Sequence, residues 1–457
     1  MSILFTNCKI PFGTGNKSVK SCFRVDAGKF GKFDETLPPI SGEKVIDLNG
    51  NLVLPGGIDP HVHFNTPGYE ERETFENGSA FAATGGITTV IDMPCTSLPP
   101  VTTLENLKIK LQAIGGHSHV DYALWGGVSG NCLADKRWRQ HMADLWNAGV
   151  VGFKTYSLSG MATFTHLSPE ELEQVIEAAS EIGALIGHHA EAAEIVLPIL
   201  KELIEFGRTD PKAYAESRPA VAEISAVERF IRAVSDNHAS GHIVHVSTGV
   251  ATKLIGEAKR AGIDISGETC PHYLSFSEED LIENGSVLKT APVVKTKDDS
   301  ANLWKALADG DLAFAASDHA PCPAEQKQTG SIWTDYGGIS GTGTLLPFMY
   351  SEGFRKGRIT LAQLVELTSM NAAKRFGIYP KKGAFLAGSD ADFVVIDEQQ
   401  DTTIHGGNFP SKGKLTPFEN WQIAGKIVAT YLRGRRIYSE SEGVAEDRIG
   451  KWIRRKD

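Results

Sequence analysis

The stretch LVLPGGIDPHVH, residues 52–63, decides the fold. It begins as an apolar strand, passes a proline and two glycines, and ends in two histidines separated by one valine. Residues two apart in a strand point to the same face, so His61 and His63 can reach one cation. If the stretch is the first strand of a barrel, both histidines stand at its C-terminal end, where barrel active sites lie. A coincidental pair is the alternative, because buried neutral histidines are common.

Strand-like and helical segments alternate after this stretch, from residue 56 to about residue 383. Ser168 and Pro169 illustrate the helical signals, as an N-cap and the first helical position. Apolar strand candidates recur at residues 88–92, 120–124, 150–154, 184–189, 243–246, 264–266 and 313–318. This alternation predicts a parallel sheet and, at this length, an α/β fold of the (β/α)₈ TIM barrel type.

Both ends of the chain are rich in strand signals. Asn49-Gly50, between the apolar runs 45–47 and 52–54, predicts a hairpin. Strands return near residue 384, for example at residues 391–397 and 427–434. We therefore expect one small β domain beside the barrel and a polar tail or helix at the end. The expected division is residues 1–55 plus 384–440 for the β domain, 56–383 for the barrel and 441–457 for the C-terminal tail.

Composition excludes several classes of protein. The 457 residues carry a net charge of −10 without a long basic run, which argues against nucleic-acid and anionic-membrane partners. The sequence has no apolar run of transmembrane length, and its start lacks the basic and apolar regions of a signal peptide. Six scattered cysteines form no CxxC pair, so we expect neither a zinc knuckle nor a disulfide framework, and a reducing cytoplasm fits best.

Lys154 ends the apolar run of residues 150–153. A buried lysine that stays charged and unpaired is costly, and burial lowers its pKa. The neutral amine can take up carbon dioxide and become a carbamate, whose two oxygens can bridge two metals. The alternative is a lysine that reaches water at the end of its strand.

His189 and His245 each close another apolar run. Alternation along a strand places His188 and His189 on opposite faces, so only one of them can point inward. His242 looks like a surface residue at the start of its strand. Asp318 ends a further apolar run, where an acid is expensive to bury unless it meets a cation. Its alternative role is that of a helix N-cap.

Together these residues form a candidate metal site drawn from five predicted strands. Its members are His61, His63, Lys154, His189, His245 and Asp318. Imidazole and carboxylate ligands suit zinc first, with manganese, cobalt, nickel or iron as alternatives. Two metal ions bridged by hydroxide would lower the pKa of that water, polarise a carbonyl oxygen and stabilise the oxyanion that forms.

The order of these residues resembles the amidohydrolase superfamily. More narrowly, the chain is similar to the cyclic amidohydrolases: allantoinase, hydantoinase, dihydropyrimidinase and dihydroorotase. The matching segments keep their order along nearly the whole chain, at residues 55–63, 85–94, 152–154, 216–219, 268–273, 317–319 and 388–392.

The resemblance implies a (β/α)₈ barrel with a β-sandwich side domain, two divalent metal ions and N6-carboxylysine at position 154. One ion would be held by His61, His63, Lys154 and Asp318, and the other by Lys154, His189 and His245. Asp318 would take the proton of the bridging hydroxide as it attacks the ring amide, then deliver it to the leaving nitrogen. By the same resemblance the protein is expected to be a homo-oligomer, commonly a tetramer.

Substrate choice depends on a few positions near these ligands. Dihydroorotases usually carry arginine where this chain has Asn65, and asparagine cannot make the bidentate charged contact to a carboxylate. The segments 317–327 and 336–341 look most like allantoinase, which favours conversion of allantoin to allantoate, a cyclic ureide. Cys95-Thr96, however, replaces the Leu-Asn of allantoinases. The candidate substrate-binding residues are Asn65, Tyr156, Ser159, Thr290 and His319.

The alternatives to allantoinase are three other cyclic amidohydrolases and one protein that is not an enzyme. L-selective hydantoinases also resemble the region of Cys95, and dihydropyrimidinases carry a tyrosine soon after the lysine, as Tyr156 does here. Dihydroorotase is the less favoured member of the group. The non-enzyme alternative is a scaffold like the dihydropyrimidinase-related cytoskeletal regulators, but those have lost metal ligands, whereas this chain retains all six positions.

Overall fold

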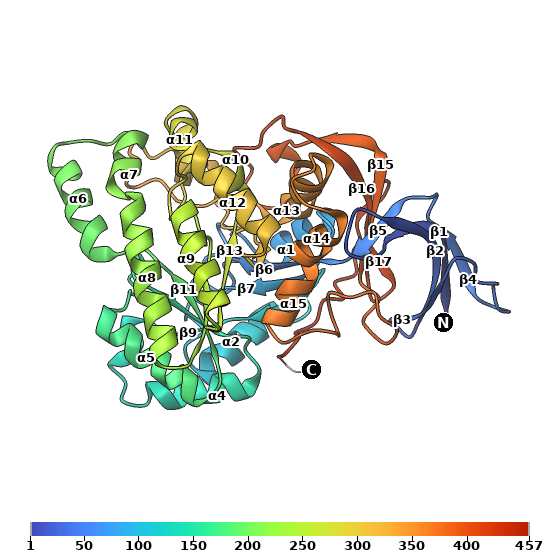
Figure 1. The fold of residues 1–457 in the computed structure, drawn as a ribbon, viewed down its shortest axis with the longest axis horizontal. Helices are drawn as coiled ribbons and strands as arrows, with labels where there is room; N and C mark the ends of the chain where they lie inside the picture. Colours follow the sequence, from blue (N-terminus) through green and yellow to red (C-terminus); the bar gives the residue numbers. More distant parts are fainter. Residues whose placement is uncertain (1, 456–457) are drawn as a thin grey trace.

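The central part of the chain forms a barrel of parallel strands surrounded by helices (Figure 1). The computed structural model describes residues 2–455. Within that range the barrel strands are β6 (Gly57–Val62), β7 (Ile87–Asp92), β8 (Asp121–Leu124), β9 (Gly126–Gly127), β10 (Phe153–Tyr156), β11 (Leu185–His189), β12 (Ser240–Ile243), β13 (Ile265–Thr269) and β14 (Phe314–Ala315). Only Trp125 separates β8 from β9, and these two pair with β7 and β10 respectively, so they act as one strand. The predicted (β/α)₈ barrel is confirmed.

The barrel closes between its first and last strands. His319, just beyond β14, forms a parallel bridge with Val62, and the backbone N–H of His63 donates to the carbonyl of His319 over 2.8 Å. The Asp59 carboxylate accepts from the backbone N–H of Ser317 over 3.0 Å. Closure therefore brings residues 61–63 beside Asp318, although they are far apart in sequence.

Helices follow the barrel strands and cover the barrel from outside (Figure 1). They are α1 (Phe75–Thr84), α2 (Leu104–Ile114), α3 (Gly130–Leu133), α4 (Trp138–Ala148), α5 (Pro169–Glu181), α6 (Ala193–Glu205), α7 (Pro211–Ser217), α8 (Ala220–Asp236), α9 (Gly249–Arg260), α10 (Pro271–Ser275), α11 (Glu278–Asn284), α12 (Lys297–Asp309), α13 (Thr342–Phe348), α14 (Leu361–Val365) and α15 (Asn371–Arg375). Ser168 caps α5 as predicted, in a reciprocal capping box with Glu171. Among the described residues, no helix combines the length and apolar character needed to cross a membrane.

Trp125 fills the interior of the barrel. Its side chain is fully buried, and its indole N–H donates to the Pro60 carbonyl over 3.2 Å. Gly152 and Gly187 lie directly against the ring, where an added Cβ would come within 2.6 and 2.8 Å of indole carbons. The two glycines on neighbouring strands thus make room for one large side chain.

The two ends of the chain form a second, sheet-rich region at one side of the barrel, coloured blue and red in Figure 1. Its nine strands are β1 (Ile3–Pro11), β2 (Ser18–Asp26), β3 (Lys29–Asp34), β4 (Lys44–Asp47), β5 (Leu52–Pro55), β15 (Phe393–Thr403), β16 (Gln422–Leu432), β17 (Arg435–Ser439) and β18 (Gly443–Val444). β5 lies between β1 and β15, which joins the two ends of the chain. The sheet curls on itself, because Phe23 and Phe393 are on non-neighbouring strands yet their ring centroids are 5.1 Å apart.

The predicted hairpin at Asn49-Gly50 is wrong. Both residues have positive φ, 55° and 74°, but β4 and β5 do not pair with each other. Each runs parallel to β1 along one edge. The turn between them also bonds to β1, with the Leu48 N–H donating to Thr6 and the Gly50 N–H donating to Asn7. Pairing with the edge of β1 therefore determines where β4 and β5 lie, in spite of the local turn signal.

The last described residues dock under the barrel. The carbonyl of Lys451 accepts from Tyr122 N–H over 3.0 Å, and Ile453 N–H donates to the Tyr122 carbonyl over 2.7 Å. Tyr122 lies near the start of β8, at the end of the barrel opposite the C-terminal strand ends. We retain as a proposal the division at residues 55/56 and 383/384, because β5 ends at Pro55 and β6 begins at Gly57. The expected tail at residues 441–457 is not wholly separate from the sheet, because β18 pairs with β17.

Candidate active site

The six predicted metal-type residues gather at the C-terminal ends of the barrel strands. His61 lies in β6, Lys154 in β10, and His189 ends β11. The three others follow their strands: His63 just after β6, His245 after β12 and Asp318 after β14. The four histidines and Lys154 are buried, and the Asp318 side chain is only 13% exposed. The barrel thus assembles polar groups from five strands in one nearly water-free place.

Two sets of ligand-type atoms converge within this cluster. Asp318 Oδ1 lies 3.1 Å from His61 Nε2 and 3.4 Å from His63 Nε2, and these three residues are close enough to share an ion. His189 Nδ1 faces His245 Nε2 at 3.0 Å. The His61 and His245 rings, with centroids 5.3 Å apart, connect the two sets. The first set is a candidate metal site, and the His189–His245 pair lies beside it.

Three of the four imidazoles are oriented by an outer partner on the nitrogen that faces away from the cluster. Glu268 Oε1 lies 2.6 Å from His61 Nδ1, Thr96 Oγ1 lies 3.1 Å from His63 Nδ1, and Glu191 Oε2 lies 2.8 Å from His189 Nε2. Such partners fix the ring orientation and tautomer of metal-binding histidines. The fourth ring differs, because Nδ1 of His245 is buried without a partner.

Lys154 occupies the middle of the cluster. Its side chain is fully buried, and Nζ has no hydrogen-bond partner among the described residues, lying 4.8 Å from the ring centroid of Tyr156. Burial lowers the pKa of Lys154 from 10.5 to about 8. A buried amine without a partner is costly to retain. The residues present therefore fit a site for divalent metal ions.

Asp318 is the acid of the site. Burial alone would raise its pKa, but the surrounding imidazoles, His61 foremost, hold the pKa of Asp318 well below its usual range. Its backbone is in the left-handed region with φ 49°, as are those of His245 with φ 40° and Asn65 with φ 56°. Non-glycine residues in this conformation carry strain of order 1–3 kcal/mol, which clusters at functional sites.

The five candidate substrate-binding residues differ in their contacts. Asn65 is buried, donates to the His63 carbonyl over 3.0 Å and leaves Oδ1 without a partner. Thr290 Oγ1 is likewise buried and unpartnered. The Tyr156 hydroxyl lies 3.2 Å from the Cys95 thiol, and its ring stacks on His189.

Two of the five are engaged elsewhere. Ser159 donates to the Phe164 carbonyl within its own loop over 2.7 Å. His319 is fully buried, packs against the Phe64 and Phe81 rings, and accepts from the Gly341 backbone N–H over 3.0 Å. The Tyr156 ring therefore contacts the metal-type cluster at His189, whereas Asn65, Ser159 and His319 bond to nearby backbone groups.

His242 was predicted at the surface, which is wrong, and its neighbour Glu268 was not predicted as part of the site. His242 is fully buried rather than on the surface, with Nδ1 2.7 Å from Ser266 Oγ and Nε2 3.1 Å from Glu268 Oε2. Glu268 thus connects His242 to His61. Glu268 belongs to the family-like segment 268–273, but only the packing of β12 against β13 reveals which rings its carboxylate faces. His188 points away from the site, as alternation requires, and contacts Thr155 and Ser157.

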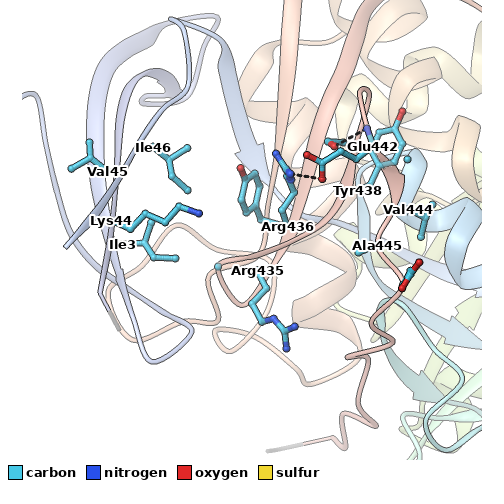
Figure 2. A pocket seen from close by; sticks show the side chains of 15 residues that line it. Ile3, Lys44, Val45, Ile46, Arg435, Arg436, Tyr438, Glu442, Val444 and Ala445 are labelled. Carbon is cyan, nitrogen blue, oxygen red and sulfur yellow. Dashed lines mark hydrogen bonds and ion pairs between the residues drawn. The ribbon is translucent and has the colours of Figure 1, made fainter. Parts of the chain in front are cut away.

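A surface groove on the sheet region is not part of this site. Figure 2 shows Lys44, Val45 and Ile46 on one side and Arg435 and Arg436 on the other. Its arginines are already paired, Arg436 with Glu442 and Arg435 with Asp447, both over 2.6 Å. The groove lacks the buried, unpartnered groups that mark the barrel cluster.

Comparison with known proteins agrees with this geometry. The sequence model of the amidohydrolase family matches residues 52–437. An allantoinase of Rubrobacter xylanophilus is 36% identical over 90% of this chain and 88% of its own length. An L-hydantoinase of Paenarthrobacter aurescens is 33% identical over 100% of this chain and 98% of its own length. The solved L-hydantoinase (dihydropyrimidinase) from Arthrobacter aurescens superimposes with a TM-score of 0.93 at 31% identity, covering 99% of both chains. The chain therefore belongs to the amidohydrolase family.

Proposed function

We propose that this protein is a two-metal hydrolase that opens a cyclic ureide, with allantoin to allantoate as its reaction. The observation that carries the proposal is the fully buried, unpartnered Nζ of Lys154 among four imidazoles and the Asp318 carboxylate. A carbamate on Lys154 would turn this unpartnered amine into an anionic bridge. The family match and the allantoinase relatives support the reaction class.

The proposed ligand sets follow the two clusters of atoms. His61, His63 and Asp318 would hold one ion, His189 and His245 would hold the other, and a carboxylated Lys154 would supply oxygen ligands to both. Zinc is the first choice for imidazole and carboxylate donors, with manganese, cobalt, nickel or iron as alternatives. When bound, the two ions would activate water and polarise the ring carbonyl.

Asp318 moves the proton in this proposal. The low pKa of Asp318 keeps its carboxylate ionised, so its oxygens are free to take the proton of the attacking water. The same carboxyl group then donates that proton to the leaving ring nitrogen. Burial of the surrounding side chains excludes bulk water, which strengthens each of these interactions.

Asn65 supports a neutral ring as the substrate. Its unpartnered Oδ1 is an acceptor suited to an N–H of a ureide, whereas a carboxylate-bearing ring would meet no cation at this position. Dihydroorotase is therefore the less favoured activity. A hydantoinase or dihydropyrimidinase is the second candidate, favoured by the Tyr156 hydroxyl beside Cys95 and by the fit to the solved L-hydantoinase.

A substrate panel tests the proposal. Purified protein is assayed for metal and then with allantoin, hydantoin, dihydrouracil and dihydroorotate. We expect about two divalent ions per chain and the highest kcat/KM for allantoin. Full activity in a metal-free preparation would contradict the two-metal site, and no turnover of any of the four rings would favour the dihydropyrimidinase-related scaffold.

Assembly and location are further parts of the proposal. We infer a homotetramer by resemblance to the family, to be checked by light scattering. The described cysteines are all free, which supports a reducing cytoplasm as the compartment.

A further inference from the structure

Glu191 contacts one imidazole of the site and no other. Its carboxylate is 2% exposed, and Oε2 lies 2.8 Å from His189 Nε2. An ionised carboxylate only accepts hydrogen bonds, so Nε2 of His189 must carry the hydrogen. The lone pair of that ring is then on Nδ1, the nitrogen that faces His245 Nε2 at 3.0 Å.

Arg218 anchors Glu191 from its other side. Its Nη1 donates to the same Oε2 over 2.5 Å, and its guanidinium lies 5.1 Å from the ring centroid of Tyr214. Lys295 donates to the backbone carbonyl of Arg218, which fixes the chain at this point. The buried negative charge is therefore compensated, and its position is set by residues that do not touch the metal-type cluster.

We propose that Glu191, anchored by Arg218, is a positioning residue that selects the tautomer of His189 and so prepares one of the two metal positions. This inference rests on the proposed two-metal function. The other position has its own outer partners, since Glu268 orients His61 and Thr96 orients His63. Glu191 therefore acts on the position of Lys154, His189 and His245 alone.

Loss of the carboxylate frees the His189 ring. In Glu191→Ala, Nε2 loses its acceptor and the hydrogen can move to Nδ1, where it blocks the lone pair that a metal needs. Removal of such an outer partner typically lowers metal affinity about 10- to 100-fold. We expect that loss for one ion, and a change of less than about 3-fold for the other, because its outer partners remain.

Zinc release from the loaded, full-length protein tests the inference. Wild type and variants are titrated with a chromogenic zinc chelator, which resolves the two ions by the chelator concentration that removes each. Glu191→Ala should release one ion at a much lower concentration, and Glu191→Gln, which keeps an acceptor oxygen but not the charge facing Arg218, should show a smaller shift. Glu194→Gln is the matched control, because it breaks a surface pair with Arg229 near the same helix start.

The outcomes distinguish failure of the positioning role of Glu191 from failure of the proposed function. Equal weakening of both ions, or wild-type affinity for both in Glu191→Ala, overturns the positioning role. A wild-type chain that holds fewer than two divalent ions of any of the proposed metals overturns the proposed function itself, and that result precedes any variant. Circular dichroism monitors folding, and if Glu191→Ala does not fold, Glu191→Gln decides.

Discussion

Two buried clusters in this molecule each surround one lysine and differ in how that lysine is paired. At one end of the barrel lies the cluster around Lys154, and at the other lies a cluster around Lys382. Asp121, Asp390 and Asp392 are as close together as His61, His63 and Asp318, and by proximity alone either set could hold a metal.

The difference lies in what the lysine contacts. Lys382 Nζ lies 2.5, 2.9 and 2.7 Å from carboxylate oxygens of Asp121, Asp390 and Asp392, and Arg433 also pairs with Asp121. Lys154 Nζ has no partner among the described residues. These contacts raise the pKa of Lys382, whereas burial lowers that of Lys154. The cluster around Lys382 has paired charges and joins the barrel to the sheet, whereas Lys154 has no hydrogen-bond partner among the described residues.

Lys154→Ala should give the largest effect. We expect activity to fall by about 10³-fold or more, comparable to the loss of one strong electrostatic stabiliser, because the bridge between the two metal positions is gone. Short carboxylic acids should restore part of the rate by replacing the carbamate. Turnover assays with and without added acid measure this, and undiminished activity in the variant would contradict the bridging role.

Lys382→Met tests the comparison at the paired cluster. Asp392 would lose its cation, and Asp121 and Asp390 would keep only Arg433 and Lys29, so we expect the free energy of unfolding to fall by about 3–5 kcal/mol. Lys154→Met, the same substitution in the other cluster, should not destabilise the metal-free protein. Urea denaturation of both variants measures the contrast, and equal losses would show that the two clusters are alike.

A pH titration sharpens the contrast. The pKa of Lys154 is about 8 in the folded protein and 10.5 in an unfolded chain, so between these values the unfolded chain binds more protons. Stability of the metal-free protein should therefore rise with pH across that window, by on the order of 3 kcal/mol from this group. Lys154→Met should lose that increment in parallel urea titrations. The same slope in the variant would assign it to other lysines.

Asn65→Ala should give the smallest effect. Loss of one neutral hydrogen bond to substrate costs about 1 kcal/mol, so we expect kcat/KM to fall roughly 5- to 10-fold at unchanged zinc content. Thr89→Val is the matched control, because Thr89 Oγ1 is also buried and unpartnered but lies within β7. A similar loss in both variants would remove the substrate role of Asn65.

The barrel and the members of the metal-type cluster could be predicted because both follow from strand periodicity. His61 lies near the end of β6 and His63 directly follows it, and the other ligand-type residues stand where an apolar run ends. Parallel strands closed into a barrel necessarily bring such ends together. The sequence pattern therefore predicts which residues form the cluster, although it gives no distances between them.

The outer partners could not be predicted in this way. Glu268 lies within β13, 207 residues from His61, and its role depends on how the strands are rotated against each other. His242 was misplaced for the same reason, since the start of a strand is buried when another strand and Phe376 pack over it. The hairpin prediction at Asn49-Gly50 was wrong because β4 and β5 both pair with β1, and a local turn signal does not predict such pairing.

The position of β5 between β1 and β15 has a consequence for how the chain is made. A ribosome releases the N-terminal strands first and the whole barrel next, and only then residues Phe393–Thr403 that complete the pairing of β5. Until translation reaches that point, the nascent sheet presents an open edge, which is the usual starting point for aggregation. Truncated transcripts should therefore yield chains that need chaperones, even when the truncation spares every ligand of the barrel.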